Sequence, residues 1–228
     1  MRVLTWNLYH GRAVPPAGRD LQADFAAALA GWAWDVALLQ EVPPWWAPVL
    51  ADACDADART ALTSRNELPW LRRALADRWP DLVKSGGGGA NAILVRRESA
   101  QITEHRSVRL RRWPERRVCH AVALDSGLWC ANLHAQVHSA ARARADIALA
   151  AAATLGWARG RPALLGGDFN VPNPAAPGFE HLGGHGVDHV LGHRVAADGP
   201  AQVLDHGRLS DHAPIIVRVL PLAVGGAG

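Results

Sequence analysis

Apolar runs and helical periodicity alternate at the start of the chain. Residues 2–6 (RVLTW) and 35–42 (DVALLQEV) are short, mainly apolar runs of the kind that form buried strands. Between them, residues 20–34 place apolar side chains at the three- and four-residue spacing of one helix face. The pattern predicts a strand, a helix and a second strand.

The middle of the chain favours antiparallel strands. Four strand candidates follow one another with only Gly, Ser or Pro breaks, and strands without intervening helices usually pair antiparallel. A helix is predicted on either side of this group, over residues 68–79 and over the Ala-rich residues 139–160. The four strand candidates are residues 92–97, 101–110, 117–124 and 128–135.

Strands return in the last third of the chain, over residues 162–170, 186–191, 194–204 and 212–220. So many strands, with helices interspersed among them, pack best as two mixed β-sheets face to face with helices on their outer faces. The sequence therefore predicts an α/β protein.

No internal segment is rich enough in Gly, Pro or Ser to divide the chain, so we expect residues 1–222 to form a single domain. The SGGGGAN stretch at residues 85–91 is expected to be a mobile loop, and residues 223–228 a disordered tail.

Composition narrows the class of protein. A chain of 228 residues that is 49% hydrophobic is long enough for one sizeable core. Its three cysteines are too few and too scattered for a disulfide framework, and no CxxC pair indicates zinc. With no apolar leader and no run of about eighteen apolar residues, we expect a soluble cytoplasmic monomer without a transmembrane segment.

Arginine supplies nearly all of the positive charge, with Lys84 the single lysine and a net charge of only +3. Guanidinium groups bind phosphate through two parallel hydrogen bonds, so clustered arginines are candidate contacts for an anionic ligand. The stretch RLRRWPERR at residues 109–117 either faces phosphate or forms a solvated surface ribbon. The candidate substrate-binding residues are Arg65, Arg112, Arg116 and Arg117.

Polar side chains recur at the ends of the apolar strands. The stretch LLGGDFNVP at residues 164–172 on its own also fits a turn, because Gly, Asp and Asn adopt turn conformations readily. A turn does not require acids, amides and imidazoles at the other strand ends, where packing does not favour them. The recurrence therefore indicates a functional site, whose candidates are Asn7, Glu41, His134, Asp168, Asn170, Asp188, Asp211 and His212.

Seven motifs resemble, in order, those of the endonuclease/exonuclease/phosphatase superfamily, which includes deoxyribonuclease I, apurinic/apyrimidinic endonucleases, sphingomyelinases and inositol polyphosphate 5-phosphatases. They are TWNLYHG, ALLQEV, NAILVR, ANLHA, LLGGDFN, GVDHVL and LSDHAPI, between residues 5 and 215. GDFN with a downstream SDH is the most specific pair. The resemblance implies a four-layer α/β sandwich and hydrolysis of phosphate esters with a divalent metal, usually Mg²⁺.

The residue types suit a metal-dependent hydrolase. Mg²⁺, or Mn²⁺ in its place, prefers hard oxygen ligands, and Glu41 and Asp211 are the best candidates. The resemblance adds Asn7, either directly or through water.

Hydrolysis also needs an oriented water and charge stabilisation on phosphate. Asp168 is predicted to position or deprotonate the water. Asn170, and His134 and His212 as imidazolium ions, are predicted to donate to phosphoryl oxygens.

The resemblance also implies that Asp188 pairs with His212, and such a carboxylate orients the ring and raises its pKa. Whether this histidine is the general base or stabilises charge stays open. Val95 departs from the family pattern, since many relatives carry serine there.

Two other interpretations compete with the hydrolase. His181, His185, His189 and His193 would form a metal-binding stripe on a helix, but the interspersed glycines disfavour that helix by about 1 kcal/mol each. A non-catalytic module that binds anions or nucleic acid on the same sandwich is the second alternative. The compact chain favours a small phosphoester, a nucleic-acid strand or a lipid head group as partner, and leaves the choice open.

Overall fold

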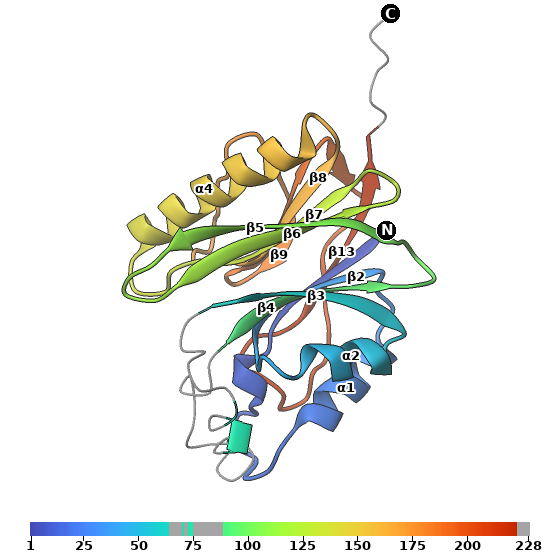
Figure 1. Cartoon of the computed structure of the whole chain (residues 1–228), viewed down its shortest axis with the longest axis vertical. Coiled ribbons are helices and arrows are strands. Elements are labelled where there is room, and N and C mark those ends of the chain that lie inside the picture. The colour runs from blue at the N-terminus through green and yellow to red at the C-terminus, as the bar shows by residue number, and fades with distance from the viewer. Residues whose placement is uncertain (64–69, 71–72, 75–88, 223–228) are drawn as a thin grey trace, which may run out of the picture.

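The structure is a computed structural model that describes residues 1–63, 70, 73–74 and 89–222. Nearly all of the predicted helix at residues 68–79, most of the predicted loop at 85–91 and the predicted tail at 223–228 lie outside the described residues. Within them, two β-sheets pack face to face (Figure 1).

The first sheet has the strand order β11-β13-β1-β2-β4-β3, with β12 beside β13. These strands are β1 (Arg2–Asn7), β2 (Val36–Val42), β3 (Ala56–Leu62), β4 (Ala90–Arg96), β11 (Val195–Ala197), β12 (Gln202–Val203) and β13 (Ile215–Pro221). The second sheet has the order β5-β6-β7-β8-β10-β9. Its strands are β5 (Ile102–Arg111), β6 (Arg117–Leu124), β7 (Trp129–His134), β8 (Ala163–Asp168), β9 (Glu180–His185) and β10 (Asp188–His193).

Helices cover both outer faces (Figure 1). On the first sheet lie α1 (Gln22–Gly31) and α2 (Ala47–Ala53), and on the second lies α4 (Ala140–Ala158). A short 3-10 helix, η1 (Tyr9–Gly11), follows β1. The molecule is therefore the four-layer α/β sandwich expected from the sequence.

Each interface between layers has its own apolar cluster. Leu38 and Val122 are buried between the two sheets, Trp6 and Phe25 between the first sheet and its helices, and Ile147 between α4 and the second sheet. These side chains come from the apolar runs that predict the strands and from the apolar faces of the helices. Burial of each large side chain contributes about 1.5–3 kcal/mol, so packing on both faces fixes which way each strand faces.

One parallel pair of strands lies in each sheet. β1 pairs with β2 and β7 with β8 in parallel register, whereas the other described neighbours are antiparallel. Because parallel strands end at the same edge, each pair delivers its carboxyl-terminal residues together. Asn7 therefore lies near the end of β2, and His134 lies opposite Asp168.

An amide pair connects the two sheets just below this edge. Gln40 donates from Nε2 to the Oδ1 atom of Asn132 at 2.8 Å. Asn132 in turn donates to the carbonyl groups of Leu39 and Ala92 at 2.9 and 3.0 Å. These buried hydrogen bonds can form only when the two sheets lie in one position relative to each other.

Four elements were not predicted, namely η1, α2, β3 and β9. Helix α2 is short, and β3 has mostly half-exposed or exposed positions without a long apolar run. β9 (EHLGGH) is rich in glycine, which is unusual in strands. Among the described residues, no helix has the length and apolar character needed to cross a membrane.

Candidate active site

A cleft of about 250 Å³ lies at the edge where the two parallel pairs end. All of the predicted strand-end residues except Asp188 line it, namely Asn7, Glu41, His134, Asp168, Asn170, Asp211 and His212. Both sheets and the loop before β13 contribute, so residues far apart in the sequence meet in one cavity.

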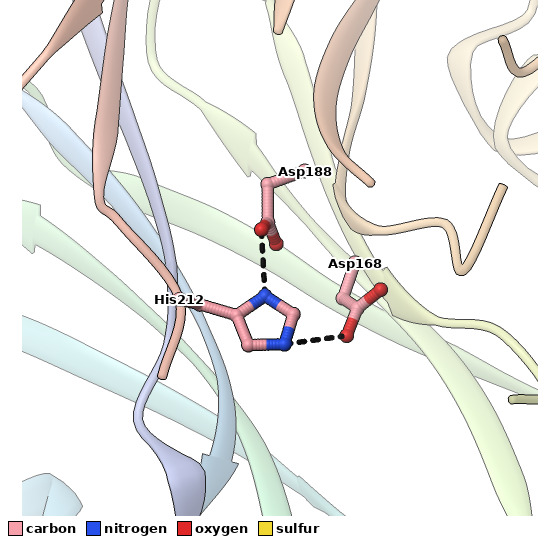
Figure 2. Close-up of side chains that lie close together, drawn as sticks. All are labelled: Asp168, Asp188 and His212. Carbon is pink, nitrogen blue, oxygen red and sulfur yellow. Dashed lines mark hydrogen bonds and ion pairs between the residues drawn. The ribbon is translucent and has the colours of Figure 1, made fainter. Parts of the chain in front are cut away.

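Asp188 does not line the cleft but pairs with His212, which does (Figure 2). His212 and the Oδ2 atom of Asp188 are joined through Nδ1 at 2.7 Å, and Nε2 of the same ring lies 3.9 Å from Oδ2 of Asp168. Burial is the largest single influence on the pKa of His212 and would lower it, but the hydrogen bond to Asp188 and the negative charges of Asp188, Asp168 and Asp211 together outweigh burial and raise the pKa to about 9. The ring is therefore a cation at neutral pH.

Asp168 ends β8 and is almost completely buried, with 1% of its surface exposed. Although the composition of the GDFN stretch also fits a turn, its aspartate therefore lies inside the fold. Burial and the negative charge of Asp188 raise the pKa of Asp168 to about 6. A carboxylate with such a pKa still ionises near neutrality and accepts protons more readily than an exposed aspartate.

Two amides hold Asp168. Asn7 donates from Nδ2 to Oδ2 of Asp168 at 3.0 Å, while its own Oδ1 accepts from the backbone N–H of Tyr9 at 2.9 Å. The backbone N–H of Asn170 donates to Oδ1 of Asp168 at 2.9 Å, as in an Asx turn. The same stretch therefore forms a turn and also holds Asp168 in the site.

Glu41 lies near the end of β2, with its carboxylate in the cleft. Its Oε2 atom lies 3.1 Å from Nε2 of His10, and its Oε1 atom 3.9 Å from Nε2 of His134. Burial and the nearby charge of Asp168 raise the pKa of Glu41 to about 7. A buried carboxylate so disfavoured as an anion is the kind of group that a cation stabilises.

His134 differs from His212 in charge. Its Nε2 atom lies 3.5 Å from Oδ2 of Asp168. Burial, followed by the positive charge of Arg117, lowers the pKa of His134 well below its ordinary value. The sequence-based assignment of His134 as an imidazolium ion is therefore corrected, because the ring is neutral at neutral pH.

Two sets of residues offer ligand atoms to a metal ion. Asp168, Asp188 and His212 bring one such atom each within 4.8 Å of one another, so their spacing would allow an ion. The short pairing of His212 with Asp188 and the raised pKa oppose coordination, since a protonated ring has no lone pair to give. Glu41 and Asp211 also line the cleft, and their carboxylates are the hard oxygen ligands that Mg²⁺ or Mn²⁺ prefers.

The backbone around the cleft is strained. Five non-glycine residues that line it or border it have positive φ, between 48° and 65°: Tyr9, His10, Glu41, Asn170 and Ser210. Such conformations cost about 1–3 kcal/mol each and persist where the surrounding fold imposes them. Their concentration here supports a functional role for the cleft.

Gly167 allows β8 to approach β7 directly before Asp168. Its φ is +135°, and a Cβ atom at this position would overlap the carbonyl oxygen of Leu133. Only glycine fits there without backbone movement. The glycine in GGDFN therefore places the carboxylate of Asp168 beside His134.

The predicted arginines have different places. Arg116 and Arg117 line the cleft, and Arg117, with 6% of its surface exposed, donates to Oε2 of Glu115 at 2.7 Å. Arg112 is exposed and does not line the cleft, contrary to the expectation. Arg65 lies outside the described residues.

Several residues lining the cleft were missed by the sequence analysis. Tyr9 and His10 directly follow the predicted strand end in TWNLYHG, and that proximity was the available signal. Glu115 lies within the arginine-rich stretch at residues 109–117, which was the available signal, whereas nothing in the local sequence marks Thr63 and Val137.

The alternative metal-binding stripe is not realised. All four histidines lie on strands β9 and β10, where Nε2 of His181 lies 3.0 Å from Nδ1 of His189 and Nδ1 of His193 lies 2.8 Å from the carbonyl oxygen of Gly178.

Comparisons with known proteins agree with this geometry. Residues 4–212 match the model of the Endonuclease/Exonuclease/phosphatase family. A mannosyl-6-phosphatase from Bacteroides thetaiotaomicron has a TM-score of 0.72 and 16% identity, with 96% of this chain and 99% of that chain covered. A humanised TDP2 from D. rerio has a TM-score of 0.71 and 14% identity, with 96% and 98% covered.

D. rerio TDP2 was also solved with a single-strand DNA product, and that structure has a TM-score of 0.67 and 12% identity over 96% of this chain and 98% of that chain. At such identities the structural matches show the fold alone. A search among curated protein sequences found no match. Because the family match spans nearly the whole chain, from β1 to the residue that pairs with Asp188, this protein belongs to the Endonuclease/Exonuclease/phosphatase family.

Proposed function

We propose that this protein is a hydrolase of phosphate esters that uses Mg²⁺, or Mn²⁺ in its place. The observation that carries the proposal is that Asp168, the pair of His212 with Asp188, and the partly buried Glu41 meet at one cleft. A base with a raised pKa and a fixed cation side by side are the groups that water attack on phosphate requires.

Asp168 is the group proposed to take the proton of the attacking water. Its pKa of about 6 makes it a good match for a base at neutral pH, and Asn7 holds its Oδ2 atom in place. His212 is a poorer candidate for that role because its pKa of about 9 keeps it protonated. The sequence left this choice open, and the charges favour Asp168.

The remaining residues are proposed to bind the phosphoryl oxygens. His212 offers Nε2–H beside Asp168, and one N–H of Asn170 stays available because its other donation goes to the carbonyl of Ala135 at 2.9 Å. Neutral His134 still donates one hydrogen bond. Arg116 and Arg117 add positive charge to the same cleft.

Glu41 and Asp211 are proposed to hold the divalent ion. Glu41 fits this role because its pKa of about 7 reflects burial and neighbouring negative charge, which a cation offsets. When bound, such an ion supplies positive charge to the oxygens of the phosphate and the leaving group. Asn7 contributes indirectly, since its oxygen already accepts from Tyr9.

The test uses purified protein with bis-p-nitrophenyl phosphate and p-nitrophenyl phosphate, each with Mg²⁺ and with a chelator. We expect Mg²⁺-dependent release of p-nitrophenol that falls about 10²-fold or more in Asp168→Asn. Asp24→Asn on the surface of α1 serves as the control and is expected to retain the wild-type rate. Binding of inorganic phosphate without turnover of either ester would instead support a non-catalytic anion-binding module.

The substrate is best approached from the structural neighbours. These neighbours include a mannosyl-6-phosphatase and a TDP2 complex with a single-strand DNA product, so a sugar 6-phosphate and single-stranded DNA head the panel. RNA, inositol phosphates and sphingomyelin complete it. If the substrate is a polyanion, log affinity falls steeply with log salt concentration, and a flat response favours a small phosphoester.

A further inference from the structure

A partly buried ion pair lies between β5 and α4, outside the set of groups assigned above. Asp146 on α4 has 1% of its surface exposed, and its Oδ1 atom lies 2.9 Å from Nη2 of Arg111. Nε of Arg111 also donates to Oδ1 of Asp146 at 3.1 Å. An ion pair that is removed from water rarely stabilises a fold more than apolar side chains of the same size would. The pair is therefore better explained by the positions in which it holds the neighbouring segments.

Asp146 also holds the segment that follows β7. Its Oδ2 atom accepts from the backbone N–H of Gln136 at 3.1 Å. The preceding residue, Ala135, donates its N–H to the carbonyl of Asp168 and accepts from Nδ2 of Asn170, both at 2.9 Å. Two successive residues of this segment are therefore hydrogen-bonded, Ala135 to the end of β8 and Gln136 to Asp146.

Arg111 extends this connection to a second wall of the cleft. It is the last residue of β5, and the turn after it leads to Arg116 and Arg117, which line the cleft. The segment after β7 contributes Val137 to the same cleft. The ion pair thus connects the two segments that line the cleft, the turn after β5 and the residues after β7, at the points where they leave their strands.

We propose that Asp146, paired with Arg111, is a positioning residue for the reaction. It holds residues 135–138 against the end of β8 and so fixes the amide of Asn170 relative to Asp168. The inference rests on the proposed function, because it assigns Asn170 to the substrate phosphate. A shift of about 1 Å in such a group costs about 10²-fold in rate.

Three substitutions separate the contributions. Asp146→Asn keeps an oxygen that can accept from Gln136 but removes the charge, whereas Asp146→Ala removes both. Arg111→Met removes the partner and leaves the contact of Asp146 with Gln136. The matched control is Asp24→Asn, which breaks the exposed 2.7 Å pair of Asp24 with Arg19 on the opposite side of the sandwich.

For hydrolysis of bis-p-nitrophenyl phosphate, we expect Asp146→Ala to lower kcat at least tenfold and Asp146→Asn to lower it less. The Mg²⁺ concentration at half-maximal rate should not change, because Glu41 lies on the other sheet. A residue that only stabilised the fold would lower Tm and leave kcat normal below the transition. If kcat stays within twofold of wild type in Asp146→Ala, or if the loss appears only as a higher Mg²⁺ requirement, the positioning role is wrong.

Hydrogen exchange gives a readout that does not need turnover. The amide of Gln136 should exchange at least tenfold faster in Asp146→Ala, while amides in β7 and β8 keep their protection. If the wild type hydrolyses neither ester, the proposed function fails, whereas exchange still tests whether Asp146 holds this segment. Unchanged exchange at Gln136 would overturn the inference. If Asp146→Ala does not fold, the kcat values of Asp146→Asn and Arg111→Met test the inference, and values within twofold of wild type in both would overturn it.

Discussion

Asp188 on β10 and His212 in the loop before β13 form a 2.7 Å ion pair that joins the two sheets at the cleft. The loop is also tied to β1, because Nε1 of Trp6 donates to the carbonyl of His212 and Oγ of Ser210 donates to the carbonyl of Asn7. The first sheet therefore positions His212, and Asp188 on the second sheet stabilises its positive charge. Its charge is a property of the assembled sandwich.

Asp188→Asn is expected to shift the alkaline limb of the rate profile. The pKa of His212 is about 9 with Asp188 in place, so the wild-type rate should fall as pH rises through about 9. Without the carboxylate, the ring should lose its proton at lower pH, and activity at pH 8 should fall about tenfold or more. Rates and an NMR titration of His212 check this, and an unchanged alkaline limb would contradict it.

Glu41→Gln is expected to stabilise the metal-free protein at pH 8. The folded-state pKa of Glu41, about 7, lies above its ordinary 4.5, so this carboxyl favours folding below pH 4.5 and loses that contribution as pH rises toward 7. At pH 8 the wild type must hold a buried anion, which glutamine removes. Melting curves with a chelator at pH 5.5 and pH 8 test this; a variant less stable than wild type at pH 8 would show the sign to be wrong.

The metal requirement should depend more on Glu41 than on Asp211. Glu41 is largely enclosed whereas Asp211 is exposed, so water more readily replaces the second carboxylate. We expect Glu41→Ala to raise the half-saturating Mg²⁺ concentration at least tenfold and Asp211→Ala to raise it less. Titrations that follow the rate and Tm against Mg²⁺ concentration measure this for both variants. If the half-saturating Mg²⁺ concentration is unchanged in Glu41→Ala, Glu41 is not a metal ligand.

The exchange of amide and acid in GGDFN should cost activity in both directions. Asp168→Asn removes the proposed base, and Asn170→Asp places a carboxylate against the carbonyl of Ala135 and beside phosphate. Each should lower turnover about 10²-fold or more. Asn170→Asp should also lower Tm, because its donation to Ala135 is lost. Near-normal turnover in both variants would leave the stretch as a turn.

Gly167→Ala should destabilise the protein by at least about 2 kcal/mol, because φ of +135° is strained for alanine and the added Cβ meets Leu133. Gly156, within α4, is the matched control, since a Cβ there meets nothing within 4 Å. Gly156→Ala should stabilise by about 0.5–1 kcal/mol. Denaturant unfolding compares the two, and equal effects would contradict the packing argument.

The sequence predicts the elements whose cores are apolar and the polar residues that end them. Residues 2–6 and 35–42 appear as β1 and β2, and Asn7, after the first run, and Glu41, near the end of the second, reach the cleft. β9 was missed because its glycines have a packing role that local preference cannot reveal: Gly184 lies against the ring of His189, where a Cβ would overlap it.

The charges of the two histidines in the cleft also could not be predicted from the sequence, because they depend on the groups that the fold places around each ring. His134 and His212 both come from sequence motifs that suggest imidazolium ions. Burial beside Arg117 leaves the first neutral, and the carboxylate of Asp188 leaves the second charged. Val137 and Glu115 show the same limit, since only the packing of their segments brings them to the cleft.

The last long strand, β13, pairs with the first, β1. During synthesis, the edge of β1 that β13 covers has no partner until residues 215–221 leave the ribosome. Asp211 and His212 come shortly before that strand, so the nascent chain cannot form the complete cleft until residues 211 and 212 have been made. A chain that stalls before residue 211 would instead present an open sheet edge, which chaperones and proteases recognise as unfinished.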